Sequence, residues 1–202
     1  MRTHNIIAVG AFIAVGACCG ELAANSKWVY GGGFSLPIPV NQLEGKGWMQ
    51  DAVIEVDDHV NILDLDIVVD ITHTKVFDLQ LMLKSPAGTN KLLNYYNPAD
   101  EYFDGQGYSN TIFDDEASSY INEAIAPFNG RFKPRKPCSL SAFDGQDAFG
   151  QWRFRIYDAF YADAGTLNSV RLIISNPEPG SMTLFAVGAF LFRYFSAAGR
   201  NR

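Results

Sequence analysis

The stretch "NILDLDIVVDITHT", residues 61–74, has a period of two in its hydrophobicity. Its apolar positions on one face are Leu63, Leu65, Ile67, Val69 and Ile71. The polar positions on the other face are Asp64, Asp66, Asp70 and Thr72. This alternation predicts a β-strand with one face in a hydrophobic core and the other in water.

The same alternation recurs in residues 79–83, 150–158 and 167–175, with loops rich in Gly, Asp, Asn and Pro between these runs. We see no sustained helical period. Short strands joined by turn-rich links predict an all-β fold, a single jelly-roll or galactose-binding-like β-sandwich over residues 25–176. The inward-facing residues predicted for its core are Leu65, Ile67, Val69, Leu81, Trp152, Phe154 and Leu172.

The two ends of the chain have a different composition. Arg2, the apolar run of residues 6–17 and small residues up to Ala24 predict a secretory signal peptide over residues 1–24. The alternative is a lipoprotein signal, in which Cys18 would be lipidated. Both interpretations predict export.

At the other end, residues 177–202 contain Pro177, Glu178 and Pro179, an apolar run from residue 182, and a basic end that starts at Arg193. This arrangement resembles the PEP-CTERM sorting signal of bacterial exported proteins. The resemblance implies a short transmembrane helix and recognition by an exosortase, a membrane transpeptidase. The expected location is the cell surface or the extracellular space, with transient anchoring by the C-terminus and a tail that is not needed for folding.

Residues 25–176 are acidic. The 22 acidic residues of the chain less Glu21 and Glu178 leave 20, and the 16 basic residues less Arg2 and the three C-terminal arginines leave 12, so the balance is −8. This charge argues against a nucleic-acid partner, which needs clustered Lys and Arg. Cys138 is the one cysteine in this range, which excludes a disulfide within it.

Several stretches match one family in order. They are "ITHTKVFDLQLMLKSPAGT", "TIFDDEA", "FNGRFKPRKPCSLSAFDGQDAFGQWRFRIYD" and "DAGTLNSVRLII". Residues 34–175 resemble the P/Homo B domain of subtilisin-like proprotein convertases. The resemblance implies a jelly-roll sandwich that, in convertases, stabilises the protease domain and tunes its activity.

Serine protease catalysis is not expected from these residues. A catalytic triad needs a nucleophile, a base and a group that orients the base. His73 ends the inward-facing row of the first strand, which is typical of a hydrogen-bonded residue at the edge of a core, and His59 lies in a polar turn. The chain contains no Gly-x-Ser-x-Gly motif. We therefore expect a non-catalytic domain.

The acidic run Asp114, Asp115 and Glu116 is the leading candidate for site chemistry. Adjacent carboxylates repel one another unless a cation or water screens them, and Ca²⁺ accepts six to eight oxygen ligands in irregular loops. We expect Asp104 to complete the set, with Asp158 and Asp163 as a weaker second pair. For both, a solvated acidic turn is the alternative.

The aromatic residues Tyr95, Tyr96, Tyr102, Phe103, Tyr108 and Tyr120 surround this run. Exposed rings beside a calcium site would suit a carbohydrate-binding surface, whereas packed rings would only attach loops to the sandwich. The sequence thus predicts a surface-delivered binding or structural module, with two alternatives. One is an adhesin for extracellular polysaccharide or matrix, and the other is an accessory domain for a separate protease.

Overall fold

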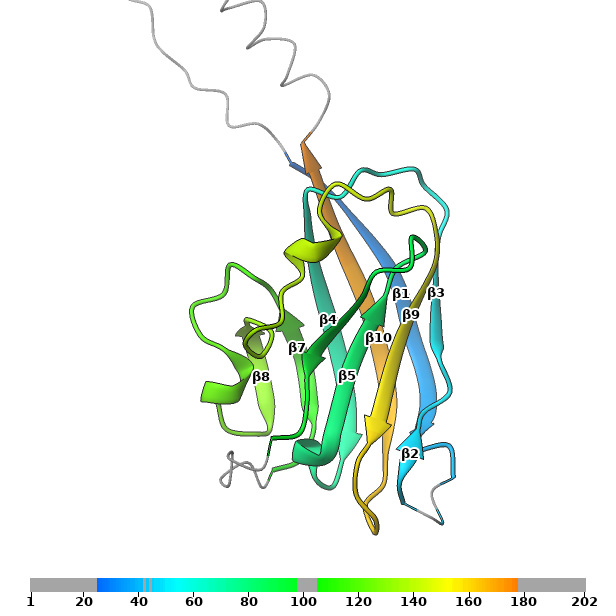
Figure 1. Ribbon diagram of the computed structural model, residues 1–202, viewed down its shortest axis with the longest axis vertical. Helices are drawn as coiled ribbons and strands as arrows, with labels where there is room; N and C mark the ends of the chain where they lie inside the picture. The colour runs from blue at the N-terminus through cyan, green and yellow to red at the C-terminus, as the bar shows by residue number, and fades with distance from the viewer. Residues whose placement is uncertain (1–24, 42, 44, 98–104, 178–202) are drawn as a thin grey trace, which may run out of the picture.

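The computed structural model describes residues 25–41, 43, 45–97 and 105–177, and the statements below concern these residues (Figure 1). The predicted signal peptide, Asp104, Glu178, Pro179 and Arg193 lie outside them. The strands are β1 (Asn25–Ile38), β2 (Gly47–Trp48), β3 (Ala52–Val56), β4 (Asp64–His73), β5 (Leu79–Lys84), β6 (Asn90–Asn94), β7 (Tyr108–Phe113), β8 (Phe128–Phe132), β9 (Gly150–Asp158) and β10 (Gly165–Pro177). Three 3-10 helices, η1 (Val76–Asp78), η2 (Ile121–Glu123) and η3 (Ser141–Phe143), lie in the connections.

Two sheets face each other and form a β-sandwich (Figure 1). Sheet A has the strand order β1-β10-β4-β7-β8, and sheet B has the order β2-β9-β5-β6 with β3 also paired to β9. Neighbouring strands are antiparallel except β7 and β8, which are parallel. The predicted all-β sandwich is confirmed.

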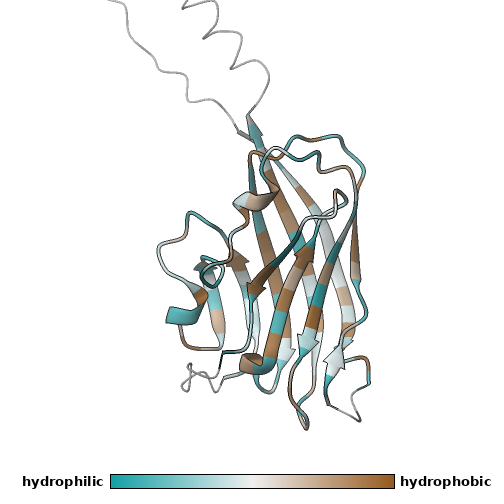
Figure 2. Cartoon of the chain, viewed as in Figure 1, coloured by the Kyte–Doolittle hydropathy of each residue, from teal (hydrophilic) through white to brown (hydrophobic). Residues whose placement is uncertain are grey.

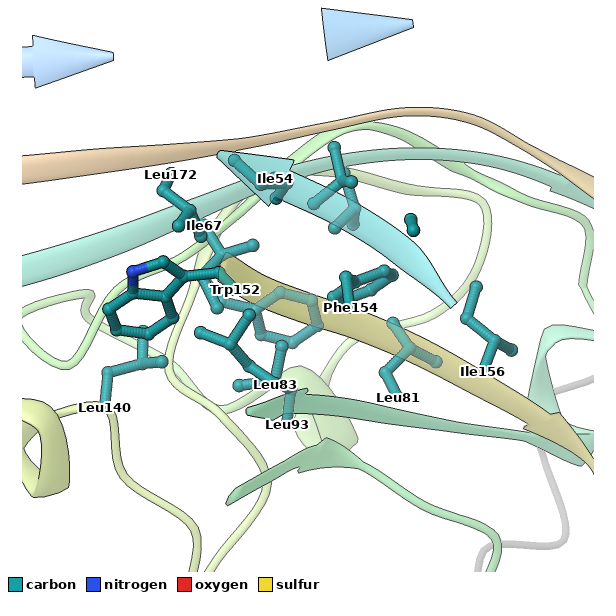
Figure 3. Packing of buried hydrophobic residues seen from close by; sticks show 14 of the residues in the cluster. Ile54, Ile67, Leu81, Leu83, Leu93, Leu140, Trp152, Phe154, Ile156 and Leu172 are labelled. Carbon is teal, nitrogen blue, oxygen red and sulfur yellow. The ribbon is translucent and has the colours of Figure 1, made fainter. Parts of the chain in front are cut away.

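The core lies between the two sheets, where the apolar faces of the strands meet (Figures 2 and 3). All seven residues predicted for the core are at most 1% exposed. Trp152 packs against Phe143 with ring centroids 5.3 Å apart, and its Nε1–H donates to the Ala148 carbonyl at 2.8 Å. The one polar atom of this side chain is thereby satisfied inside the core.

The period-two prediction for the stretch 61–74 is wrong at its beginning and on its outer face. Leu63 is 51% exposed, because β4 begins one residue later, at Asp64, and Leu63 lies beyond the end of the core. Asp66 was predicted to face water and is buried. Since β4 lies between β10 and β7 in the middle of sheet A, neighbouring side chains cover its outer face.

Both ends of the described chain lie at one end of the sandwich (Figure 1). Asn25 at the start of β1 pairs with Pro177 at the end of β10. The connection between β9 and β10 and the two-residue strand β2 lie at the opposite end. No helix within the described part of the chain has the length and hydropathy needed to cross a membrane.

Candidate functional site

The acidic run follows β7, and its carboxylates bind different partners. Asp114 is buried, and its Oδ1 accepts from the backbone N–H of Glu116 at 2.7 Å. Asp115 turns to the loop before η3, where it accepts hydrogen bonds from the Ser139 hydroxyl and from the backbone N–H groups of Leu140 at 3.1 Å and Ser141 at 2.8 Å. The structure therefore directs Asp115 away from Asp114 and uses it to hold a neighbouring loop.

Arg131 of β8 is the cation that faces this run. Its Nη1 donates to Asp114 Oδ2 and, at 3.2 Å, to Oδ2 of Asp66 on β4. Neither Asp66 nor Arg131 was predicted as a site residue, because the alternation of residues 61–74 places Asp66 on a solvent face and the partners of Arg131 are distant in the sequence. In the described ranges, no three acidic, histidine or cysteine side chains converge closely enough to hold a metal ion.

The carboxyl groups around Arg131 have shifted pKa values. Burial raises the pKa of Asp66 to about 6. The hydrogen bond with Asp114 and burial raise the pKa of Glu116 to about 7. For Asp114 burial acts in the same direction, but hydrogen bonds from Arg131 and Glu116 outweigh it and hold the pKa below its ordinary value. Among these three carboxyl groups, Asp114 is thus the one whose ionised form the structure favours most.

The second predicted pair, Asp158 and Asp163, lies at the opposite end of the sandwich. Asp158 is fully buried, and its Oδ2 lies 3.0 Å from Nε2 of His73, which is 2% exposed. Asp158 Oδ1 accepts from the Phe160 backbone N–H at 3.2 Å. Asp163 accepts from the Thr74 hydroxyl at 2.9 Å and lies 3.9 Å from Lys75 Nζ. The pair therefore attaches both ends of the β9–β10 connection to the end of β4.

A third carboxyl group, Asp78 of η1, joins this buried cluster. Burial, together with the hydrogen bond to Asp163, raises the pKa of Asp78 to about 6. Because this folded-state pKa lies above the ordinary value of 3.8, the protonated form favours folding. That contribution is complete below about pH 4 and is lost as the pH rises through about 6.

We therefore expect the melting temperature to fall between about pH 4 and pH 6. Asp78→Asn should reduce this fall, because asparagine stays neutral and can still donate to Asp163. Thermal unfolding of the wild-type chain and of this variant across the pH range checks the prediction. Equal slopes in the two proteins would contradict it.

The buried cluster supports a surface that we call the aromatic end. It consists of the exposed apolar side chains at this end of the sandwich, namely Val40, Leu43, Trp48, Phe160 and Tyr161. The two segments that carry these residues, around Gly45 and around Ala162, lie in contact. A Cβ atom added at Gly45 would lie only 2.6 Å from the backbone nitrogen of Ala162. Tyr161 is 67% exposed, and Trp48 and Phe160 are 41% and 40% exposed.

Basic side chains lie against the rings of the aromatic end. The Arg155 guanidinium lies 4.4 Å from the centroid of Trp48, and Lys46 Nζ lies 5.2 Å from that of Tyr161. This surface was not predicted from the sequence. The stretch "AFYA", residues 159–162, contains the signal for it, because two aromatic residues in a loop without buried apolar residues indicate an exposed apolar surface.

The tyrosines that were considered for sugar binding pack onto the sandwich. Tyr108 is 1% exposed, and Tyr95 and Tyr120 are half-buried. The Arg135 guanidinium lies 4.7 Å from the Tyr95 ring, and Lys136 Nζ lies 4.2 Å from the Tyr120 ring. The Tyr96 ring packs edge-on against the rings of Phe77 and Phe160, so it supports Phe160 of the aromatic end from the inner side. Tyr102 and Phe103 lie outside the described residues.

The two histidines of the sandwich differ in access to solvent. His73 is buried, and its Nδ1 lies 2.9 Å from the Lys75 carbonyl and 3.1 Å from the Lys75 backbone nitrogen. With both ring nitrogens engaged inside the protein, His73 cannot reach a substrate as a general base. His59 is exposed, lies 2.7 Å from Asp147 and stacks on Phe149 with centroids 4.2 Å apart.

A comparison with protein-family models identifies the family of this chain. A model described as the proprotein convertase P-domain matches residues 62–174, more than half of the chain. The chain belongs to the proprotein convertase P-domain family. The matched region runs from just before β4 to near the end of β10, so it contains Asp66, Asp114, Arg131 and Asp158. In subtilisin-like convertases the P domain is a non-catalytic accessory domain.

Two solved structures of the serine protease from Aeromonas sobria, one of them a complex with the chaperone ORF2, are similar to this P domain. Each has 14% sequence identity and a TM-score of 0.46, and the match covers 77% of this chain. The chain spans 27% and 28% of the two protease chains. No curated protein matches the chain.

Proposed function

We propose that this P domain is an exported, non-catalytic binding module that docks onto a protein through its aromatic end. The observation that carries the proposal is the exposure of Trp48, Phe160 and Tyr161 on segments fixed by buried contacts. An exposed apolar group of this kind marks an interaction site on a soluble domain. His73, Thr74 and the Phe160 backbone N–H already bind Asp158 and Asp163 and so fix the β9–β10 connection. Docking would therefore order few additional side chains.

The composition of the aromatic end favours a protein as the partner. Tryptophan, tyrosine and arginine dominate binding energy at protein interfaces, and Trp48, Tyr161 and Arg155 lie together here. Val40 and Leu43 add aliphatic surface, which fits a protein better than a sugar. Lys46 favours a partner with acidic groups around an apolar centre, whereas the Arg155 guanidinium already pairs with Asp51. A separate subtilisin-like protease is the leading candidate, because P domains assist such proteases in convertases.

Extracellular polysaccharide is the second candidate. The exposed ring of Tyr161 is flat and rigid, and a sugar face can stack on such a ring. This observation supports the adhesin hypothesis at a different surface from the one that the sequence suggested.

The delivery route is proposed from the sequence. We propose that residues 1–24 direct export and that an exosortase recognises the motif at Pro177, Glu178 and Pro179 with the basic end from Arg193. The membrane would then hold the chain through its C-terminal apolar segment before processing.

We also propose that Ca²⁺ stabilises the domain at the acidic run. Asp114 Oδ1 accepts a hydrogen bond from the Glu116 backbone N–H, and Asp114 raises the pKa of the Glu116 carboxyl group, so the two carboxyl groups are close enough to contribute to one site. Asp158 and Asp163 remain a weaker alternative, because His73, Thr74 and the Phe160 backbone already bind them.

Alanine at both Trp48 and Tyr161 is expected to reduce partner binding by roughly 30-fold or more, because each loss removes a large ring from the centre of the surface. The full-length chain serves as bait in extracts of its native envelope, and affinity for a captured subtilisin-like protease is then measured directly. Binding to insoluble polysaccharide is measured by co-sedimentation in parallel.

Phe149→Ala is the matched control, because Phe149 is 47% exposed but stacks on His59 away from the aromatic end. It should leave binding unchanged. Capture of a protease that the double variant binds as well as the wild type would disprove docking through this surface. Loss of co-sedimentation without loss of protein capture would favour the adhesin.

A further inference from the structure

We propose that Asn129 and Gly130 of β8 form a self-modifying site, at which Asn129 converts to aspartate and isoaspartate without an enzyme. The pair is the one Asn-Gly sequence in the chain. β8 lies at the edge of sheet A, away from the aromatic end (Figure 1), so the conversion is independent of any partner bound there.

The reaction uses two neighbouring groups of the chain and water. The backbone nitrogen of Gly130 loses its proton to hydroxide and attacks Cγ of Asn129, and the new N–Cγ bond closes a cyclic imide. The side-chain nitrogen of Asn129 leaves as ammonia. Water then breaks one of the two carbonyl–nitrogen bonds of the imide. One choice gives aspartate, and the other gives isoaspartate, in which the main chain runs through the side-chain carbon.

Gly130 leaves its backbone nitrogen open to this reaction. A side chain on the residue after asparagine hinders the approach of Cγ, and glycine has none. A Cβ atom added at Gly130 would meet no atom within 4 Å beyond its chain neighbours, so the space beside this peptide group is open. The φ angle of Gly130 is +118°, which glycine adopts readily and other residues avoid.

The β-ladder is interrupted at the same peptide group. The pairing of β7 with β8 runs from Ser109–Asn129 to Ile112–Arg131, so two residues of β7 lie opposite Gly130 alone. Such a bulge disrupts the ladder locally and leaves a residue out of the regular pairing. The main chain at Gly130 is therefore held less firmly than in a regular strand, and it can reach the conformation that ring closure needs.

The side-chain amide of Asn129 is accessible. Asn129 is exposed, and within the described ranges of the chain no hydrogen bond holds its amide. Asn168 shows the opposite arrangement, because its Nδ2 donates to Asp70 Oδ1 at 2.8 Å and to Thr72 Oγ1 at 2.9 Å. Asn168 is also followed by Ser169, so it serves as an unreactive reference within the same protein.

Isoaspartate at position 129 would act on Arg131, two residues further along β8. It adds one atom to the main chain before Gly130, so the rest of the strand must shift. Arg131 Nη1 donates to Asp114 and, at 3.2 Å, to Asp66, and both carboxylate side chains are 4% exposed. Buried carboxylates that lose their cation destabilise a fold, so the isoaspartate form should be less stable. Ordinary aspartate only adds a charge at an exposed position and should change little.

The test incubates the full-length chain in detergent at neutral and at mildly alkaline pH and follows Asn129 by peptide mapping with mass spectrometry. The mass gain for exchange of NH₂ by OH should appear at Asn129, faster at the alkaline pH, while Asn168 stays intact. A synthetic peptide of residues 127–133 gives the rate without the fold. The folded chain should react within about a hundredfold of the peptide, because reaction only after global unfolding would be slower by about 10³ or more. The isoaspartate fraction should melt roughly 5 °C below the unmodified chain.

Asn129→Gln is the matched variant, because its longer side chain closes the ring much more slowly, and its melting temperature should not fall during incubation. Asn129→Asp, measured fresh, carries the charge without the extra main-chain atom and should melt like the fresh wild type. A folded-state rate below the hundredfold limit would overturn the proposal, since the strand would then protect Asn129. Equal loss of stability in the wild type and Asn129→Gln would overturn the effect on Arg131 and would assign the loss to another residue.

Discussion

Trp152→Ala is expected to destabilise the domain by about 3–5 kcal/mol, the range for truncating a large aromatic side chain in a core. Trp152 is fully buried between the sheets beside Leu140 and Phe154 (Figure 3), and no solvent can fill the space without meeting apolar groups. The variant also leaves the Ala148 carbonyl without its donor. Urea unfolding followed by circular dichroism gives the change in the free energy of unfolding.

Two comparisons make this result specific. Trp152→Phe keeps most of the ring and should lose less stability than alanine, with the missing hydrogen bond as part of the loss. Trp48→Ala removes the same side-chain type from the surface and should change stability by less than about 1 kcal/mol. Similar losses for Trp152→Ala and Trp48→Ala would contradict the packing described here.

His73→Phe should cost about 3–5 kcal/mol, because it leaves the carboxylate of Asp158 buried without its principal partner. Both side chains are fully buried, so water cannot replace the imidazole. The same loss should loosen the β9–β10 connection, since Asp158 also binds the Phe160 backbone N–H. Urea unfolding measures the stability, and partner capture measures the effect on the aromatic end.

The double variant His73→Phe with Asp158→Asn separates charge from shape. Asparagine is neutral and keeps an oxygen for the Phe160 N–H, so the double variant should be more stable than His73→Phe alone. If both proteins lose the same free energy, the buried charge is not the cause and the effect comes from packing.

The core could be predicted because period two is a local signal. Leu65 and Trp152 alternate with polar neighbours, and each strand by itself shows which face is apolar. Asp66 shows the same outward signal as an exposed residue, and only the position of β4 between β7 and β10 buries it. Local sequence does not contain that information.

The site residues depend still more on distant contacts. Asp158 meets His73 from 85 positions away, and Arg131 reaches Asp66 from 65 positions away. The sequence analysis identified Asp114, Asp158 and Asp163 as chemically unusual, but their partners could not be inferred without the strand order. For Tyr108 the sequence left open whether the ring is exposed or packs onto the sandwich, and in the structure its hydroxyl accepts from Asn94 in the interior.

The position of β10 has a mechanical consequence. β10 runs from the aromatic end to Pro177, over 13 residues and so about 40 Å, with β1 on one side and β4 on the other. A partner that holds the aromatic end and an anchor that follows Pro177 would pull along the strand axis. The covalent backbone of β10 would carry this load, and the hydrogen bonds to β1 and β4 on its two sides would keep the strand extended. If the proposed partner and the proposed anchor hold these two points, the domain would act as a stiff tether.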